Sequence, residues 1–192
     1  MNIKVGSCPD SWGVWFADDP KQIPWNRFLD EVVEAGYVWI ELGPYGYYPT
    51  DINQLRPEIE DRGLKVCATF LFGHLEDPDD WPRLEKQLMG AGELLSALGA
   101  EYVILIDDLH TDWFTGKRLR PKFLNDEEWR QLIATTHKVA DIARQEFGLQ
   151  LLFHSSPDSH VAYENQIERL LEDTDPDRVA LAQDIGHLSY RG

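Results

Sequence analysis

Short apolar runs alternate along the chain with amphipathic segments of helical period. Six runs have the length of buried β-strands, and they span residues 3–8, 37–42, 64–72, 102–106, 149–154 and 179–183. Five segments place apolar side chains on one face of a helix, and they span residues 24–35, 51–62, 81–98, 126–146 and 161–171. Most of these helical segments end at a glycine, as helices commonly do. The regular order of strand and helix predicts a parallel α/β sheet with helical crossovers.

Two architectures fit this pattern, a doubly wound open sheet and a (β/α)8 barrel. With period-two alternation, four strands end in a polar side chain on one common side of the sheet: Glu41, Asp107, His154 and Asp184. A barrel assembles its active site from such strand ends. An open nucleotide-binding sheet would carry a glycine-rich turn after its first strand, and residues 7–13 do not match that motif. We therefore predict an α/β fold of the (β/α)8 TIM-barrel type.

The number of strand-helix units is smaller than in a full barrel. A (β/α)8 barrel takes ~250 residues, whereas this chain has 192 residues and about six units. A six-stranded arc would expose sheet edges, which is costly. We expect one domain over residues 1–192 that is truncated on its C-terminal side, either as a fragment or as a chain that closes by pairing into an oligomer.

Composition and charge restrict the class of partner. The chain has 18 basic and 34 acidic residues and a net charge of −16, which repels phosphate backbones and anionic lipids. We therefore expect neither a nucleic-acid nor a membrane partner. No membrane-spanning run or signal peptide is visible, so the expected location is the cytoplasm. Cys8 and Cys67 lie in strand-like runs, which favours free buried thiols over a disulfide.

The end of the sixth strand carries the clearest chemical signal. Gly186 allows a sharp turn that brings His187 beside Asp184, and a divalent metal accepts this pairing of carboxylate oxygen and imidazole. The structural alternative is that Asp184 caps the following helix and His187 merely lies nearby.

Several longer motifs resemble one known family. They are Ser11-Trp-Gly13, Ala35-Gly-Tyr37, the stretch 40–50, Arg62-Gly-Leu64, the loop 154–160, and Gln183-Asp-Ile-Gly-His187. Together they are similar to the xylose-isomerase-like TIM-barrel proteins, the sugar phosphate isomerases and epimerases, and most of all to the inosose dehydratase-like branch. The resemblance runs through the whole chain and covers about the first two thirds of such a protein.

The resemblance implies a divalent metal, commonly manganese, cobalt or zinc, held at the C-terminal mouth by residues of strands five to eight. Asp184 matches the carboxylate ligand of the sixth strand, and His187 matches a neighbouring histidine that binds metal or substrate. His154 matches the first histidine of a His-Pro-His motif in the fifth strand, but Ser156 stands where the second histidine would be. We expect the last two strands and their ligands to be absent from this chain.

Further candidates lie along the same predicted rim. Glu41 is a candidate acid or base, together with His187, and its alternative role is a salt bridge. Trp12 and Trp15 are expected to stack on a sugar ring or, alternatively, to pack against the rim. Four polar side chains after strands three to five are expected to contact the substrate or to cap loops: His74, Asp107, Asp108 and His160.

These residues favour a metal-dependent enzyme that acts on a polyol or keto-sugar. Such an enzyme removes the proton next to a metal-polarised carbonyl, and the outcome is isomerisation, epimerisation or dehydration of a keto-inositol. The alternative is a catalytically impaired fragment or a non-catalytic sugar-binding remnant, which Ser156 and the missing strands favour. Repair of abasic DNA is disfavoured by the net charge.

Overall fold

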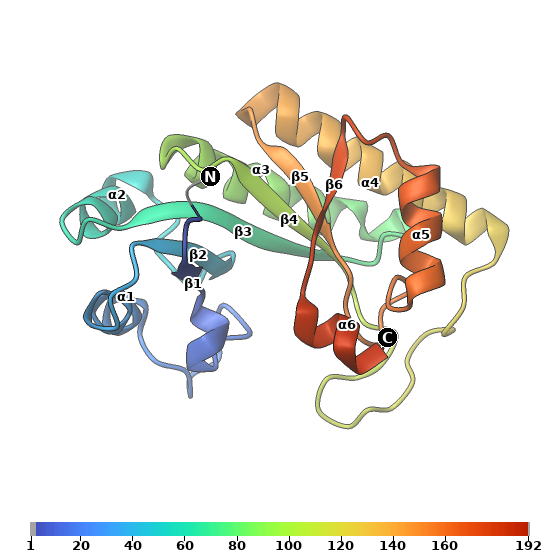
Figure 1. The fold of residues 1–192 in the computed structure, drawn as a ribbon, viewed down its shortest axis with the longest axis horizontal. Coiled ribbons are helices and arrows are strands. Elements are labelled where there is room, and N and C mark those ends of the chain that lie inside the picture. The colour runs from blue at the N-terminus through green and yellow to red at the C-terminus, as the bar shows by residue number, and fades with distance from the viewer. Residues whose placement is uncertain (1–2, 192) are drawn as a thin grey trace.

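The computed structural model describes residues 3–191, so residues 1–2 and 192 of the predicted domain lie outside it. Six parallel strands form one sheet in sequence order (Figure 1). The strands are β1 (Gly6–Ser7), β2 (Trp39–Pro44), β3 (Lys65–Gly73), β4 (Tyr102–Asp107), β5 (Gln150–His154) and β6 (Val179–Ala182). The α-helices are α1 (Trp25–Glu34), α2 (Ile52–Glu60), α3 (Trp81–Ala97), α4 (Asp126–Phe147), α5 (Glu164–Asp173) and α6 (Ile185–Arg191). The predicted parallel α/β sheet is confirmed.

The two faces of the sheet have different surroundings. On the outer face, α3 and α4 pack against each other and against β3 and β5 (Figure 1), and the main hydrophobic core lies between them. On the inner face a smaller apolar cluster forms around Ala68, Phe70, Ile104 and Ile106. Because strand side chains alternate between faces, each strand contributes to both clusters. The inner cluster is the floor on which the cavity described below is built.

The predicted orientation of β4 is wrong at one important position. Val103 and Leu105 lie in the outer core, whereas Ile104 and Ile106 belong to the inner cluster. Asp107 therefore projects toward the helices and does not share the inner face with His154. Both faces of β4 are apolar, as is usual for a parallel strand buried on both sides, so alternation alone does not distinguish them.

Some element boundaries differ from the predicted ones. β1 is shorter than the predicted run 3–8. Residues 3–5 are not part of the strand, and at the other end Pro9, which lacks a backbone N–H, begins a 3-10 helix (Pro9–Trp12) directly after Cys8. A second 3-10 helix (Pro78–Asp80) was not predicted, whereas α6 is the helix that the capping alternative for Asp184 expected. α5 begins three residues later than predicted, where the Gln166 side chain accepts the backbone N–H groups of residues 162 and 163.

The two cysteines are free thiols, as predicted, but both are half-buried and not fully buried. Burial, aided by nearby carboxylates, raises the pKa of Cys8 to about 12 and that of Cys67 to about 11, so both stay protonated at neutral pH. Within residues 3–191, none of the helices has the length and apolar character needed to cross a membrane.

Candidate active site

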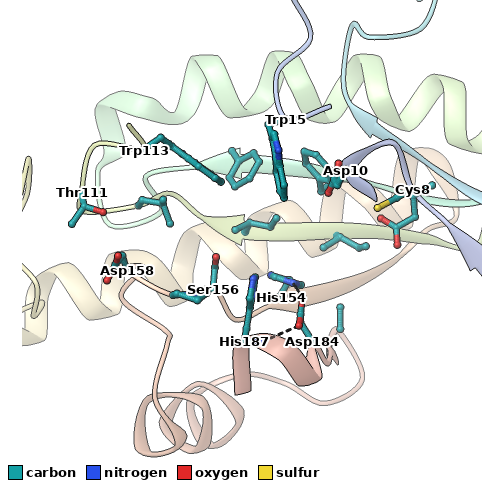
Figure 2. Close-up of a pocket in the computed structure, with 18 of the residues that line it drawn as sticks. Cys8, Asp10, Trp15, Thr111, Trp113, His154, Ser156, Asp158, Asp184 and His187 are labelled. Carbon is teal, nitrogen blue, oxygen red and sulfur yellow. Dashed lines mark hydrogen bonds and ion pairs between the residues drawn. The ribbon is translucent and has the colours of Figure 1, made fainter. Parts of the chain in front are cut away.

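A cavity of about 790 Å³ opens on the inner face of the sheet, at the C-terminal ends of the strands. Its floor is formed by apolar side chains of β3 and β4, and polar groups stand around its rim. Figure 2 shows Trp15 and Trp113 on one side of the cavity and His154, Asp184 and His187 on the other. A space of this volume accommodates a molecule the size of a sugar.

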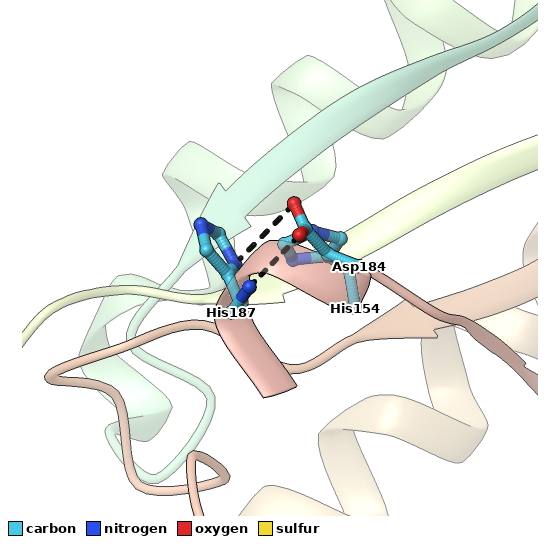
Figure 3. Close-up of side chains that lie close together, drawn as sticks. All are labelled: His154, Asp184 and His187. Carbon is cyan, nitrogen blue, oxygen red and sulfur yellow. Dashed lines mark hydrogen bonds and ion pairs between the residues drawn. The ribbon is translucent and has the colours of Figure 1, made fainter. Parts of the chain in front are cut away.

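Three predicted metal ligands gather on one wall of this cavity (Figure 3). His154 is the last residue of β5, Asp184 follows β6, and His187 lies in the first turn of α6. The Oδ2 atom of Asp184 lies 3.6 Å from His154 Nε2 and 3.6 Å from His187 Nδ1. One possible ligand atom from each residue lies within 4.8 Å of the other two. Residues separated by about 30 positions are thus brought together by adjacent parallel strands.

Asp184 also caps α6, so both roles considered for it from the sequence are compatible. Its Oδ1 atom accepts the backbone N–H of His187 at 2.9 Å, and its backbone carbonyl accepts the N–H of Leu188. The other oxygen of the carboxylate remains turned toward the two imidazoles. Capping therefore fixes the direction of the carboxylate and leaves Oδ2 available as a ligand atom.

The electrostatics of this wall favour a cation. Burial lowers the pKa of His154, so its imidazole is neutral at neutral pH, as metal coordination requires. Burial alone would raise the pKa of Asp184, but the N–H of His187 and the two imidazoles lower it overall. The Nδ1 atom of His154 is buried and has no hydrogen-bond partner among the described residues. Two imidazoles and one carboxylate suit a divalent transition metal, so these residues fit the expected cofactor.

Two carboxyl groups with raised pKa values line the same cavity near β1 and β2. Burial, together with the charge of Asp10, raises the pKa of Glu41 to about 7. Burial likewise raises the pKa of Asp10 to about 6. A carboxyl that titrates near pH 7 can both accept and return a proton at neutral pH, which is the property required of a general acid or base.

The raised pKa of Glu41 predicts a pH dependence of stability. A Glu carboxyl titrates near 4.5 in the unfolded chain and near 7 in the folded one, so the folded state holds the proton more tightly between these values. Stability is therefore lost as the pH rises through this window. Relative to the wild type, Glu41→Gln is expected to gain roughly 2 kcal/mol between about pH 5.5 and pH 8. Urea unfolding at both pH values measures this gain, and the exposed Glu34→Gln is the control. Parallel curves for wild type and Glu41→Gln would contradict the prediction.

The two tryptophans predicted to stack on a sugar lie in different places. Trp15 lines the cavity and is half exposed. Trp12 is turned away from it, because its indole Nε1 donates to Glu31 at 2.8 Å and its ring packs edge-on against Phe28. Trp12 thus has the packing role that the sequence left open.

The remaining predicted substrate contacts lie outside this cavity. His74 lies 3.8 Å from Asp108, which also contacts the Arg83 guanidinium at 3.3 Å. His160 is buried with its Nδ1 atom 2.9 Å from Asp107. The expectation that these four polar side chains share one rim with His154 is not met, because Asp107 projects to the outer face of β4 and draws His160 with it.

Several cavity residues were not identified from the sequence. Asp10 follows β1 within the motif 7–13, where its position after a strand was a usable signal. Thr111, Asp112 and Trp113 come from the polar segment after β4, which has no periodicity to place it. The position of this segment beside the cavity therefore becomes visible only in the structure.

Comparisons with known proteins agree with this geometry. The family described as xylose isomerase-like TIM barrel matches residues 29–192. Inosose dehydratase of Lacticaseibacillus casei is 29% identical over 200 residues, covering 100% of this chain and 64% of the relative. Inosose dehydratase of Geobacillus kaustophilus is 30% identical over 205 residues, covering 99% of this chain and 62% of the relative. The chain thus spans somewhat less than two thirds of the length of these relatives.

Solved structures support the barrel type of the fold. L-ribulose 3-epimerase superposes with a TM-score of 0.74 at 22% identity, covering 98% of this chain and 63% of that one. The IOLI protein with a bound zinc atom gives a TM-score of 0.72 at 18% identity, covering 99% of this chain and 66% of that one. The predicted TIM-barrel type is therefore confirmed.

Proposed function

Because the chain belongs to the xylose isomerase-like TIM barrel family, we propose that it is a metal-dependent enzyme acting on a cyclic polyol or keto-sugar. The preferred reaction is the dehydration of a keto-inositol, since the similar relatives named above are inosose dehydratases. Epimerisation or isomerisation is the second form of the same chemistry, because both begin with removal of a proton next to a carbonyl. We propose manganese, cobalt or zinc as the metal.

The observation that carries this proposal is the arrangement of two chemically different groups in one cavity. His154, Asp184 and His187 offer ligand atoms within 4.8 Å of one another. Glu41, whose pKa is about 7, lines the same cavity. A divalent metal at the first group would polarise a carbonyl or hydroxyl oxygen of the substrate. The carboxylate of Glu41 would then take the proton from the neighbouring carbon.

The other side chains of the cavity would orient the substrate. Trp15 and Trp113, with ring centroids 6.0 Å apart, offer apolar faces on which a cyclic polyol can stack. His187 lies on the opposite wall, where it can bind the metal or a substrate hydroxyl. Asp10 keeps a negative charge close to Glu41. This charge raises the pKa of Glu41 and so favours its uptake of the substrate proton.

A sugar-binding protein without turnover is the second candidate function. The observation that favours it is Ser156, which lines the cavity where the inosose dehydratase-like branch carries a second histidine. A hydroxyl is a poorer transition-metal ligand than an imidazole. This candidate keeps the stacking surface and the substrate class but loses the metal-assisted step.

One experiment separates the two functions. The purified chain is incubated with keto-inositol in D2O with Mn²⁺, Co²⁺ or Zn²⁺, and the loss of substrate and the exchange of its α-protons are followed by NMR. We expect metal-dependent exchange and dehydration, and neither after treatment with EDTA. Exchange is the more sensitive readout, because it reports proton removal even when the hydroxyl does not leave. Substrate binding without exchange or dehydration at any metal concentration would reject the enzyme and support the second candidate.

A further inference from the structure

A second group of potential ligands lies on the outer face of the sheet, away from the cavity. Glu76 follows β3, Asp107 ends β4, and His160 precedes α5. One possible ligand atom from each residue lies within 4.8 Å of the other two. Unlike the cavity residues, this group is enclosed: the side chains of Asp107 and His160 are 0% and 1% exposed, and that of Glu76 is 7% exposed.

Both ring nitrogens of His160 face oxygen acceptors, so the neutral imidazole needs a further cation beside it. Its Nε2 atom lies 3.0 Å from the carbonyl oxygen of Pro121, and its Nδ1 atom lies 2.9 Å from Asp107 Oδ2. Both partners are acceptors, but a neutral imidazole carries only one N–H. If Nε2 donates to Pro121, Nδ1 and Oδ2 present lone pairs to each other, so either a proton or a metal cation must lie between them.

Two further oxygens favour the metal cation. The Oδ1 atom of Asp107 and the Oε2 atom of Glu76 are buried and have no hydrogen-bond partner among the described residues. A proton on His160 would satisfy neither of them. Buried carboxylate oxygens without a donor are costly, and a cation that binds both carboxylates removes that cost.

The charge balance around the group points the same way. A connected network of ion pairs contains four carboxylates and two guanidinium groups: Glu76, Asp77, Asp80 and Asp108, with Arg83 and Arg120. Asp107, beside Glu76, adds a fifth carboxylate. The network is therefore short of positive charge while its histidines are neutral.

We propose that Glu76, Asp107 and His160 form a second binding site, for a structural divalent cation such as Zn²⁺ or Mn²⁺. One imidazole and two carboxylates suit these metals. The 2.9 Å approach of His160 Nδ1 to Asp107 Oδ2 is close to the ~3 Å edge of an octahedral site with bonds of about 2.1 Å, and a tetrahedral zinc site would need these two atoms to separate to ~3.4 Å. The Nε2 contact with the Pro121 carbonyl is the outer hydrogen bond that metal-binding histidines usually make.

The cation would fasten the segment after β4 to the rest of the fold. This segment runs from Asp108 to the start of α4, and it touches the group through Pro121 and through Arg120, which contacts Glu76 at 3.2 Å. The same segment carries Trp113 to the cavity. The site is therefore structural, and it does not depend on the function proposed for the cavity.

The test counts metal in a chain whose cavity ligands have been removed. We expect Asp184→Asn/His187→Asn to retain about one equivalent of Zn²⁺ after gel filtration, and its melting temperature to fall with EDTA and recover with Zn²⁺ or Mn²⁺. Adding Glu76→Gln is expected to weaken Zn²⁺ binding by more than about 100-fold. Removing a side chain that only hydrogen-bonds to a ligand costs less than this, so the larger loss would identify Glu76 as a ligand. The exposed Glu85→Gln is the matched control and should change neither quantity.

Glu76→Gln also distinguishes the cation from a simple proton. Gln keeps an oxygen for Arg120 and removes a buried negative charge beside Asp107. Without a cation, this change leaves the melting temperature the same or raises it. The proposal is overturned if the double variant retains no Zn²⁺, or if Glu76→Gln leaves Zn²⁺ binding intact.

Discussion

Replacing Asp184 with Asn is expected to remove one equivalent of bound Mn²⁺ or Zn²⁺ from the cavity, with a fall in affinity of at least about 100-fold. The side chain supplies the only carboxylate within the group that includes His154 and His187. Asn keeps the oxygen that caps α6, because an amide oxygen accepts the N–H of His187 as well as a carboxylate does. The loss is therefore one of charge and coordination, with the local fold preserved.

Isothermal titration with Mn²⁺ and metal analysis after gel filtration measure this loss. Asp61→Asn, at the exposed C-terminal end of α2, is the control and should bind metal as the wild type does. Metal-dependent proton exchange of the substrate should fall together with affinity. Undiminished metal content in the cavity of Asp184→Asn would contradict the assignment of the three ligands.

Replacing Glu41 with Gln is expected to lower the rate of substrate proton exchange by about 10²- to 10⁴-fold, the usual contribution of a general acid or base. Gln has nearly the same shape but cannot take up a proton. Metal binding should be unchanged, because Glu41 is not part of the ligand group. The same variant is expected to be more stable than the wild type above pH 7, since the buried charge is removed.

The combination of slower exchange and higher stability is specific to a buried catalytic carboxyl. A variant that lost activity through partial unfolding would be less stable. Glu34→Gln, exposed at the end of α1, is the control for both measurements. Exchange within twofold of the wild-type rate would show that another group removes the proton, and Asp10, with a pKa of about 6, would be the next to replace.

The sequence predicted well which polar residues of β2, β5 and β6 face the cavity, because they follow from period-two alternation and a common direction of parallel strands, although β2 continues two residues beyond its predicted end, to Pro44. Glu41, His154 and Asp184 accordingly line one cavity. Asp184 and His187 lie side by side as predicted, but the first turn of α6 brings them together and not a sharp turn at Gly186, which is helical. Here local pattern and tertiary structure point to the same positions.

Other parts of the site could not be predicted for identifiable reasons. β4 is apolar on both faces, so nothing in its sequence indicates which face Asp107 shares. The segment that carries Trp113 has no hydrophobic period, and its path is fixed by contacts with Glu76, Asp158 and His160 that are distant in sequence. Long-range contacts of this kind leave no signal in a single sequence.

The pairing of β5 with β6 affects how the cavity ligands move. His154 ends β5 and Asp184 follows β6, and the two strands are hydrogen-bonded in register from Leu151 and Val179 to His154 and Ala182. An ion that joined the two side chains would cross-link these neighbouring strands. Local opening of the pair would then require release of the ion, so bound metal should slow amide hydrogen exchange in β5 and β6 together.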